Sequence, residues 1–152
     1  MATLTIGSPE AMEAFGGRIG SALRAGDVVC LTGNLGAGKT TLTRGIGVAL
    51  HVRGTVASPT FVVARTHPSE SGVPLIHVDA YRLGGVDELD DLDLDWDRSI
   101  TVVEWGEDMV GKLVDSWLHI VIDRSSQADE NVRTVTVTGH GDRWGNLEWV
   151  TA

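Results

Sequence analysis

The sequence predicts a single α/β domain over residues 1–152, arranged as a three-layer sandwich with a mostly parallel central sheet and antiparallel edge strands. Two observations lead to this prediction. Short apolar runs alternate along the chain with segments whose apolar residues recur every three or four positions. The chain also contains no internal repeat, low-complexity tract or long linker that would divide it. Its 152 residues are enough to bury a core without disulfides or metals.

The first part of the chain predicts a strand, a helix and a second strand. Residues 3–6 form the first strand, and Ser8 followed by Pro9 marks the start of the helix. The apolar residues of this helix recur at spacings of three and four and are Met12, Phe15, Ile19, Ala22 and Leu23. Gly26 ends the helix. The nearly all-apolar residues 27–33 then have the pattern of a central strand that is buried on both faces.

The rest of the chain continues this alternation. Residues 42–50 predict a second helix, which Gly45 and Gly47 weaken because glycine is a poor helix former. Later strands are predicted at residues 60–66, 74–81, 99–105, 117–123 and 133–139. A short helix is expected between the strands at 99–105 and 117–123. The regular alternation of residues 133–139 is typical of an edge or near-edge strand.

Composition and termini favour a cytoplasmic protein. No apolar run approaches the roughly 18 residues that a membrane-spanning helix needs, so no contact with a membrane is expected. The first residues lack the basic and apolar regions of a signal peptide. The single cysteine, Cys30, cannot form an internal disulfide and lies in an apolar run, so we interpret it as a core residue in a reducing compartment.

The net charge of −9 is concentrated in one segment. Residues 87–97 carry seven acidic side chains and no basic one, which leaves 14 acids against 12 bases in the rest of the chain. Two interpretations stay open: a solvated surface, which is the commoner case, and a docking surface for a basic partner. Lysines and arginines occur singly, so strong direct binding of nucleic acid by this chain alone is not expected.

One motif carries specific chemistry. Gly33, Gly38, Lys39 and Thr40 satisfy the pattern G-x-x-x-x-G-K-[ST], after a buried strand and at the start of a helix, as a phosphate-binding P-loop requires. Glycines let backbone N–H groups surround an anion, the lysine reaches the β and γ phosphates, and the threonine hydroxyl binds Mg²⁺. The residues expected to contact the nucleotide are Gly33, Asn34, Leu35, Gly36, Ala37, Gly38, Lys39, Thr40 and Thr41.

The nucleotide is expected to be ATP. GTP-specific P-loop proteins read guanine through an Asn-Lys-x-Asp segment, and the second lysine of this chain, Lys112, follows a glycine instead. A P-loop also needs a carboxylate near its Mg²⁺ at the end of a neighbouring strand. Asp79 and Glu104 each end a predicted strand, so both are candidates, and the residue types alone do not choose between them.

Four segments together resemble a known family. "GNLGAGKTT" (33–41), "SPTF" (58–61), "HVDAYRL" (77–83) and "VVEWGE" (102–107), in this order and spacing, are similar to the bacterial TsaE (YjeE) family. Its members are small P-loop ATPases of tRNA threonylcarbamoyladenosine biosynthesis with a P-loop NTPase-like fold. The resemblance covers roughly residues 5–125.

The resemblance implies roles for particular residues. Thr40 and Glu104 would hold Mg²⁺, Thr60 and Asp79 would lie on switch-like segments near the γ-phosphate, and Trp105 would support the site. Lys39, Thr60, Asp79 and Glu104 then form the expected catalytic set. The resemblance also implies TsaB and TsaD proteins as partners in a complex that modifies adenosine 37 of ANN-decoding tRNAs.

Two neighbouring residues have more ordinary interpretations. His77 shares a predicted strand face with Asp79, and we interpret it as a hydrogen-bonded packing residue rather than a base. Arg82 either reaches a phosphate or pairs with the nearby acidic segment. The sequence offers Mg²⁺ ligands and phosphate donors but no evident base for the attacking water and no evident arginine finger. Hydrolysis by the isolated chain is therefore expected to be slow and to be stimulated by partners.

Three classes of function stay open at this stage. The first is an ATPase that works inside a tRNA-modifying complex. The second is a small-molecule P-loop kinase, although 152 residues with scattered arginines leave little room for a lid and a substrate pocket. The third is a nucleotide switch that binds but does not hydrolyse. An ATP turnover assay with candidate acceptors separates the second class from the others, and comparing nucleotide binding with turnover separates the first from the third.

Overall fold

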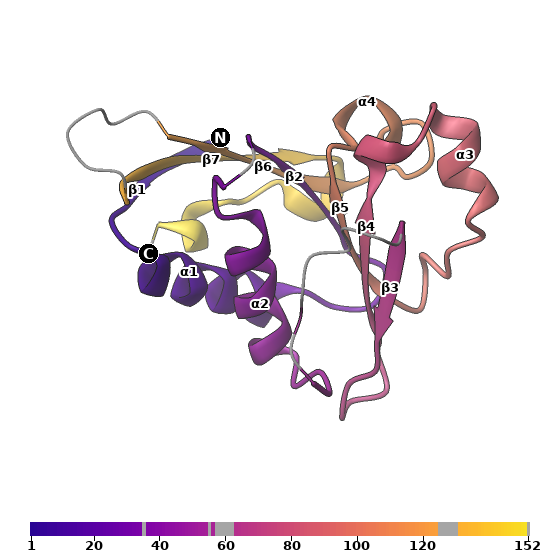
Figure 1. Cartoon of the computed structure of the whole chain (residues 1–152), viewed down its shortest axis with the longest axis horizontal. Helices are drawn as coiled ribbons and strands as arrows, with labels where there is room; N and C mark the ends of the chain where they lie inside the picture. Colours follow the sequence, from indigo (N-terminus) through magenta and orange to yellow (C-terminus); the bar gives the residue numbers. More distant parts are fainter. Residues whose placement is uncertain (35, 55, 57–62, 125–130, 152) are drawn as a thin grey trace.

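The structure, a computed structural model, describes residues 1–34, 36–54, 56, 63–124 and 131–151. In this part of the chain a seven-stranded sheet runs through the molecule in the order β1-β7-β6-β2-β5-β4-β3 (Figure 1). The strands are β1 (Ala2–Ile6), β2 (Val28–Thr32), β3 (Ala64–His67), β4 (Leu75–Asp79), β5 (Ile100–Glu104), β6 (Trp117–Asp123) and β7 (Arg133–His140).

The centre of the sheet is parallel and its edges are antiparallel. Strands β6, β2, β5 and β4 run in one direction. At the edges β3 pairs antiparallel with β4, β7 with β6, and β1 with β7. This confirms the predicted sheet, including the near-edge position of the strand that was expected at residues 133–139. Since parallel strands end at the same side of a sheet, the carboxyl ends of β2, β4 and β5 lie together.

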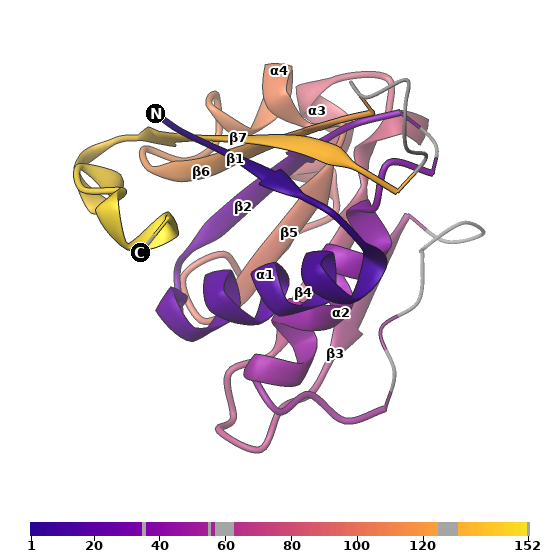
Figure 2. The same cartoon turned by 90° about the vertical axis from the view of Figure 1, so that its left-hand side faces the viewer.

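Helices cover both faces of the sheet and make the expected three layers. Helices α1 (Pro9–Ala22) and α2 (Lys39–Ala49) lie on one face, and α3 (Val86–Asp91) and α4 (Glu107–Val110) lie on the other (Figures 1 and 2). Three short 3₁₀ helices complete the described part: η1 (Ala80–Arg82), η2 (Asp142–Trp144) and η3 (Glu148–Val150).

Strand β2 is buried on both faces, as its all-apolar sequence predicts. Val29 and Leu31 belong to the core under α1 and α2, whereas Val28 and Cys30 belong to the core on the other face. Cys30 is fully buried, which confirms the prediction that it is a packing residue. Burial raises the pKa of its thiol to about 12.

Local polar groups set where two elements begin and end. Ser8 caps α1 as predicted, because its hydroxyl accepts a hydrogen bond of 3.1 Å from the backbone N–H of Ala11. The strand expected at residues 74–81 ends earlier, at Asp79. The Asp79 carboxylate accepts a hydrogen bond of 3.1 Å from the Tyr81 N–H, which turns the chain into η1.

Helices α1 and α2 touch through glycines. A methyl group at Gly16 would overlap the carbonyl oxygen of Leu42, and one at Gly45 would overlap that of Glu13. A methyl group at Gly20 would come within 2.9 Å of the Ile46 carbonyl oxygen. Gly45, one of the two glycines that weaken α2 by intrinsic propensity, is therefore a residue that lets the two helix backbones meet.

The acidic segment, residues 87–97, has one apolar side and one charged side. Leu89 of α3 is fully buried, and the seven acidic residues are all exposed.

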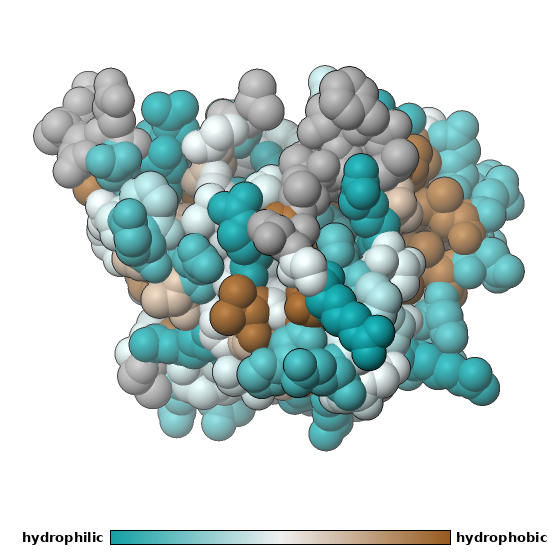
Figure 3. All heavy atoms as spheres, turned by 60° about the horizontal axis from the view of Figure 1, so that its bottom comes forward, coloured by the Kyte–Doolittle hydropathy of each residue, from teal (hydrophilic) through white to brown (hydrophobic). Residues whose placement is uncertain are grey.

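The molecular surface is mostly hydrophilic on the face seen in Figure 3, which includes α2, and the hydrophobic residues of this face form separate patches. Among the helices that the structure describes, none combines the length and apolar character needed to cross a membrane.

Candidate nucleotide site

The glycine-rich loop that matches the P-loop pattern connects β2 to α2, and two of its glycines determine its backbone conformation. Gly36 and Gly38 have φ angles of 79° and 118°, in the left-handed region that glycine adopts without strain. The Ala37 N–H donates a 2.9 Å hydrogen bond to the Asn34 carbonyl oxygen, which closes a tight turn. Helix α2 then begins at Lys39, so its free N–H groups and positive dipole end lie at the loop.

Lys39 is held inside the site by three contacts. Its ammonium group donates hydrogen bonds to the carbonyl oxygens of Gly33 and Asn34, the latter at 3.3 Å. The ammonium also lies 4.6 Å from the centre of the Trp105 ring. Burial lowers the pKa of Lys39, and the carboxylates of Glu104 and Asp79 act against this shift by favouring the charged form. The lysine side chain is only 8% exposed.

The two candidate carboxylates are direct neighbours in the sheet. Asp79 ends β4 and Glu104 ends β5, and the register of the two parallel strands pairs these residues. Glu104 is 6% exposed and accepts a 2.6 Å hydrogen bond from Nε2 of the fully buried His77. Asp79 is more exposed and already accepts from Tyr81. The histidine therefore fixes the orientation of Glu104. His77 is a buried, hydrogen-bonded residue, as predicted, and its partner is Glu104.

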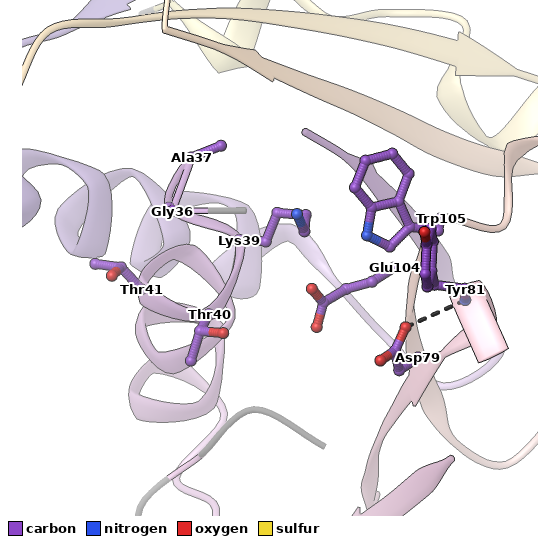
Figure 4. A pocket seen from close by; sticks show the side chains of 10 residues that line it. Gly36, Ala37, Lys39, Thr40, Thr41, Asp79, Tyr81, Glu104 and Trp105 are labelled. Atoms are coloured by element: carbon purple, nitrogen blue, oxygen red, sulfur yellow. Dashed lines mark hydrogen bonds between the residues drawn. The ribbon is translucent and has the colours of Figure 1, made fainter. Parts of the chain in front are cut away.

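A cavity of about 590 Å³ brings these groups together. Figure 4 shows the loop and the start of α2 on one side of it, and the ends of β4 and β5 on the other. The Thr40 hydroxyl is directed toward the side on which the Glu104 carboxylate lies (Figure 4). The lining residues are Gly36, Ala37, Gly38, Lys39, Thr40, Thr41, Asp79, Tyr81, Glu104 and Trp105.

Two aromatic residues form the wall beyond the carboxylates. The rings of Tyr81 and Trp105 are 5.7 Å apart, and Tyr81 is 74% exposed at the mouth of the cavity. Trp105 has a left-handed φ of 63°, which is unusual for a residue with a large side chain. Its backbone N–H donates a hydrogen bond to the Leu31 carbonyl oxygen. This backbone conformation, directly after Glu104, carries the tryptophan ring over Lys39.

The predicted site residues fall into three groups. Nine of the residues expected from the sequence and the family resemblance line the cavity, and they come from the loop, α2 and the ends of β4 and β5. Gly33 and Asn34 contribute differently, through carbonyl oxygens that accept from Lys39. Leu35 and Thr60 lie outside the described residues, so their expected roles remain predictions. Arg82 approaches Asp79 at 3.9 Å, a third arrangement beside the two considered from the sequence.

One contact to the loop has no counterpart in the sequence analysis. Arg133, the first residue of β7, donates hydrogen bonds to the carbonyl oxygens of Ala37 at 3.0 Å and of Gly36 at 3.4 Å. The arginine lies 96 residues after Ala37. No local pattern signals such a contact, because it arises from the position of β7 beside β6 in the sheet.

The oxygen groups in the cavity fit a Mg²⁺ ion. The Thr40 hydroxyl and the Glu104 carboxylate are hard oxygen ligands of the kind that Mg²⁺ selects, and both line the cavity. Histidine and cysteine, whose nitrogen and sulfur atoms favour softer metals, are not among its lining residues in the described part of the chain. The donor set therefore agrees with the magnesium site expected from the sequence.

Comparison with known proteins decides the family. The family model described as "Threonylcarbamoyl adenosine biosynthesis protein TsaE" matches residues 6–134. The chain belongs to the TsaE family. This confirms the resemblance that the loop and the three later segments indicated.

Individual TsaE relatives extend over most of the chain. A Streptomyces coelicolor protein named "tRNA threonylcarbamoyladenosine biosynthesis protein TsaE" is 58% identical over 143 residues, which cover 90% of this chain and 96% of that protein. A Bacillus subtilis protein of the same name is 36% identical and covers 92% of this chain and 87% of its own length. The crystal structure of Bacillus subtilis YdiB aligns with a TM-score of 0.75 at 30% identity, over 94% of this chain and 88% of that chain.

Proposed function

We propose that this chain is an Mg²⁺-dependent P-loop ATPase that supports threonylcarbamoyl modification of adenosine 37 in ANN-decoding tRNAs. It would work in the cytoplasm as one domain of residues 1–152, together with TsaB and TsaD proteins. One observation carries the proposal: the glycine-rich loop, Lys39, Thr40 and the carboxylates of Asp79 and Glu104 all line one cavity of about 590 Å³. Membership of a family named for this tRNA modification supports the biological role.

Each residue has a chemical task in this proposal. The backbone N–H groups of residues 33–41 bind the phosphates, and the Lys39 ammonium exchanges its carbonyl partners for β- and γ-phosphate oxygens. Thr40 and Glu104 hold Mg²⁺, which would neutralise charge on the phosphates. Asp79 and Thr60 respond to the γ-phosphate.

His77 gives Glu104 a fixed position. A buried carboxylate is costly unless it is hydrogen-bonded, and the 2.6 Å contact to His77 Nε2 supplies this partner. His77 lies on β4 two residues before Asp79, the residue that pairs with Glu104 of β5, so both side chains lie on the same face of the sheet. Glu104 therefore keeps one oxygen engaged with His77 while its carboxylate lines the cavity.

Slow turnover by the isolated chain follows from what lines the cavity. Its described lining includes one cation, Lys39, and no arginine. In related sites an arginine finger accelerates phosphoryl transfer by about 10³ to 10⁵. A partner that docks beside the cavity would have to supply this group. The exposed carboxylates of residues 87–97 offer a surface for a basic partner, and salt would weaken such docking.

The test compares two glutamate variants that lie three residues apart. Glu104→Gln should bind ATP within a few-fold of the native chain, because Lys39 and the backbone still hold the phosphates. Its Mg²⁺-dependent turnover should fall by about a hundredfold or more. Glu107→Gln is the matched control, since Glu107 accepts from Thr32 at 3.0 Å and does not line the cavity.

Calorimetry measures the affinity for ATP. Steady-state release of phosphate, with and without TsaB and TsaD proteins from the same source, measures turnover. Binding without turnover under all conditions would favour a nucleotide switch. Transfer of phosphate to a small acceptor would favour a kinase. Full activity of Glu104→Gln would move the metal-binding role to Asp79.

A further inference from the structure

We propose that Arg133 is a positioning residue for nucleotide binding: it holds the carbonyl groups of Gly36 and Ala37 so that the phosphate-binding face of the loop is set before the nucleotide arrives. The inference rests on the proposed nucleotide site and adds a residue outside the P-loop motif. It starts from the two hydrogen bonds that Arg133 donates to the loop, to Ala37 O at 3.0 Å and Gly36 O at 3.4 Å.

Peptide geometry connects these carbonyls to the anion site. In a trans peptide the C=O of one residue and the N–H of the next point in opposite directions. Drawing the Ala37 carbonyl toward Arg133 therefore turns the Gly38 N–H away from Arg133. The same reasoning applies to the Gly36 carbonyl and the Ala37 N–H, which is already bonded to Asn34 O at 2.9 Å. Arg133 thus fixes the orientation of the peptide between Ala37 and Gly38.

The arginine contacts the loop from outside the main cavity. It is not among the residues that line the 590 Å³ cavity. It lines a smaller cavity of about 100 Å³ together with Ser8, Pro9, Met12 and loop residues 36–38. This placement does not predict a direct contact between the guanidinium and a phosphate in the main cavity. It predicts an effect of Arg133 through the loop backbone.

The anchor of Arg133 is firm and its side chain is suited to the task. As the first residue of β7 it pairs with Ile6 of β1. A guanidinium group presents several N–H donors in one rigid plane and so reaches two successive carbonyls at once. The two glycines of the loop, Gly36 and Gly38, have many accessible conformations, so holding this backbone reduces the entropy that nucleotide binding would otherwise cost.

The test uses two Arg133 variants and one arginine control. Arg133→Gln removes both hydrogen bonds and should weaken Mg-ADP binding by about tenfold. Arg133→Lys keeps the charge but not the planar group, and should recover only part of this loss. Arg18→Gln is the matched control, because Arg18 also donates to a backbone carbonyl, Val150 O at 2.9 Å, far along the chain from the loop. Its affinity for Mg-ADP should equal that of the native chain.

Calorimetry gives the dissociation constants, and amide hydrogen exchange on the nucleotide-free chain gives a second readout. In Arg133→Gln the amides of residues 36–39 should exchange faster than in the native chain, while those of β2 should not. The inference is overturned if Arg133→Lys restores full affinity, if Arg18→Gln weakens binding equally, or if loop exchange is unchanged in Arg133→Gln. If the native chain itself does not bind Mg-ADP, the proposed site is wrong, and the exchange rates still show whether Arg133 orders the loop.

Discussion

The two faces of the sheet are covered in different ways. On one face α1 and α2 meet through glycines, so that a methyl group at Gly16 or Gly45 would overlap a backbone carbonyl of the opposite helix. On the other face the helices have six residues (α3) and four residues (α4), and they pack through side chains such as Leu89 and Val110. The face with backbone contact is also the face that presents the phosphate-binding loop.

This difference indicates where the molecule needs a fixed geometry. Helix α2 carries Lys39 and Thr40 in its first turn, so a shift of α2 against α1 would move both residues relative to Glu104. Contact between backbones leaves little freedom to adjust, since no side chain can rotate away. The α3 side carries exposed acidic residues instead, and their number and position can vary without moving the loop.

The largest effect is expected at the helix crossing. Gly45→Ala should lower the free energy of unfolding by about 3 kcal/mol or more, because the added methyl meets the Glu13 carbonyl and the helices must separate. Gly7→Ala is the control, since a methyl group there has no atom within 4 Å. Urea unfolding of both variants measures the difference. Equal stability of the two variants would mean that the backbone contact does not limit the α1–α2 face.

The next effect is loss of nucleotide binding without loss of the fold. Lys39→Ala removes the buried cation at the loop and should weaken ATP binding by at least about a hundredfold. Its unfolding midpoint should stay close to that of the native chain, because the hydrogen bonds of the Lys39 ammonium to described residues are made to loop carbonyls and not to the core. Calorimetry and thermal unfolding measure the two quantities. Unchanged affinity for ATP would place the phosphate site elsewhere.

A smaller effect is expected from the residues proposed to respond to the γ-phosphate. Asp79→Ala and Thr60→Ala should bind ADP normally and lose about tenfold in their preference for ATP over ADP. Asp79 is the more exposed partner of the strand-end pair and Glu104 the buried one, so we expect Glu104→Ala not to show this selective loss. Competition binding with both nucleotides measures the preference. Equal losses for ATP and ADP would make Asp79 an anchor for the nucleotide.

The smallest effect on the isolated chain is expected on the α3 side. Replacing Asp90, Asp91 and Asp93 by asparagine should change the free energy of unfolding by less than about 0.5 kcal/mol, because all three side chains are exposed. Asparagine also suits the left-handed backbone of Asp93, whose φ is 54°. ATP affinity should not change, while stimulation of hydrolysis by TsaB and TsaD proteins should fall. Unaltered stimulation would leave residues 87–97 as a solvated surface.

Part of this structure could be predicted because it depends on residues that are close in the sequence. The N-cap at Ser8, the buried strand β2 and the loop that leads into α2 each follow from a pattern a few residues long. The same holds for the two carboxylates, since a polar residue that ends an apolar strand is visible in the sequence. Their pairing required the additional assumption that β4 and β5 are adjacent and parallel, and the register supports it.

By itself, then, the sequence determined the order of strands and helices, the phosphate-binding loop and the candidate carboxylates. Only the tertiary structure decided how these groups are held. The contact between His77 and Glu104 spans 27 residues, and that between Arg133 and Ala37 spans 96. Such contacts depend on the order of strands in the sheet and on how closely α1 and α2 approach. Propensity and periodicity describe a residue's near neighbours along the chain, so they leave open which distant side chain holds a strand-end carboxylate or a loop in place.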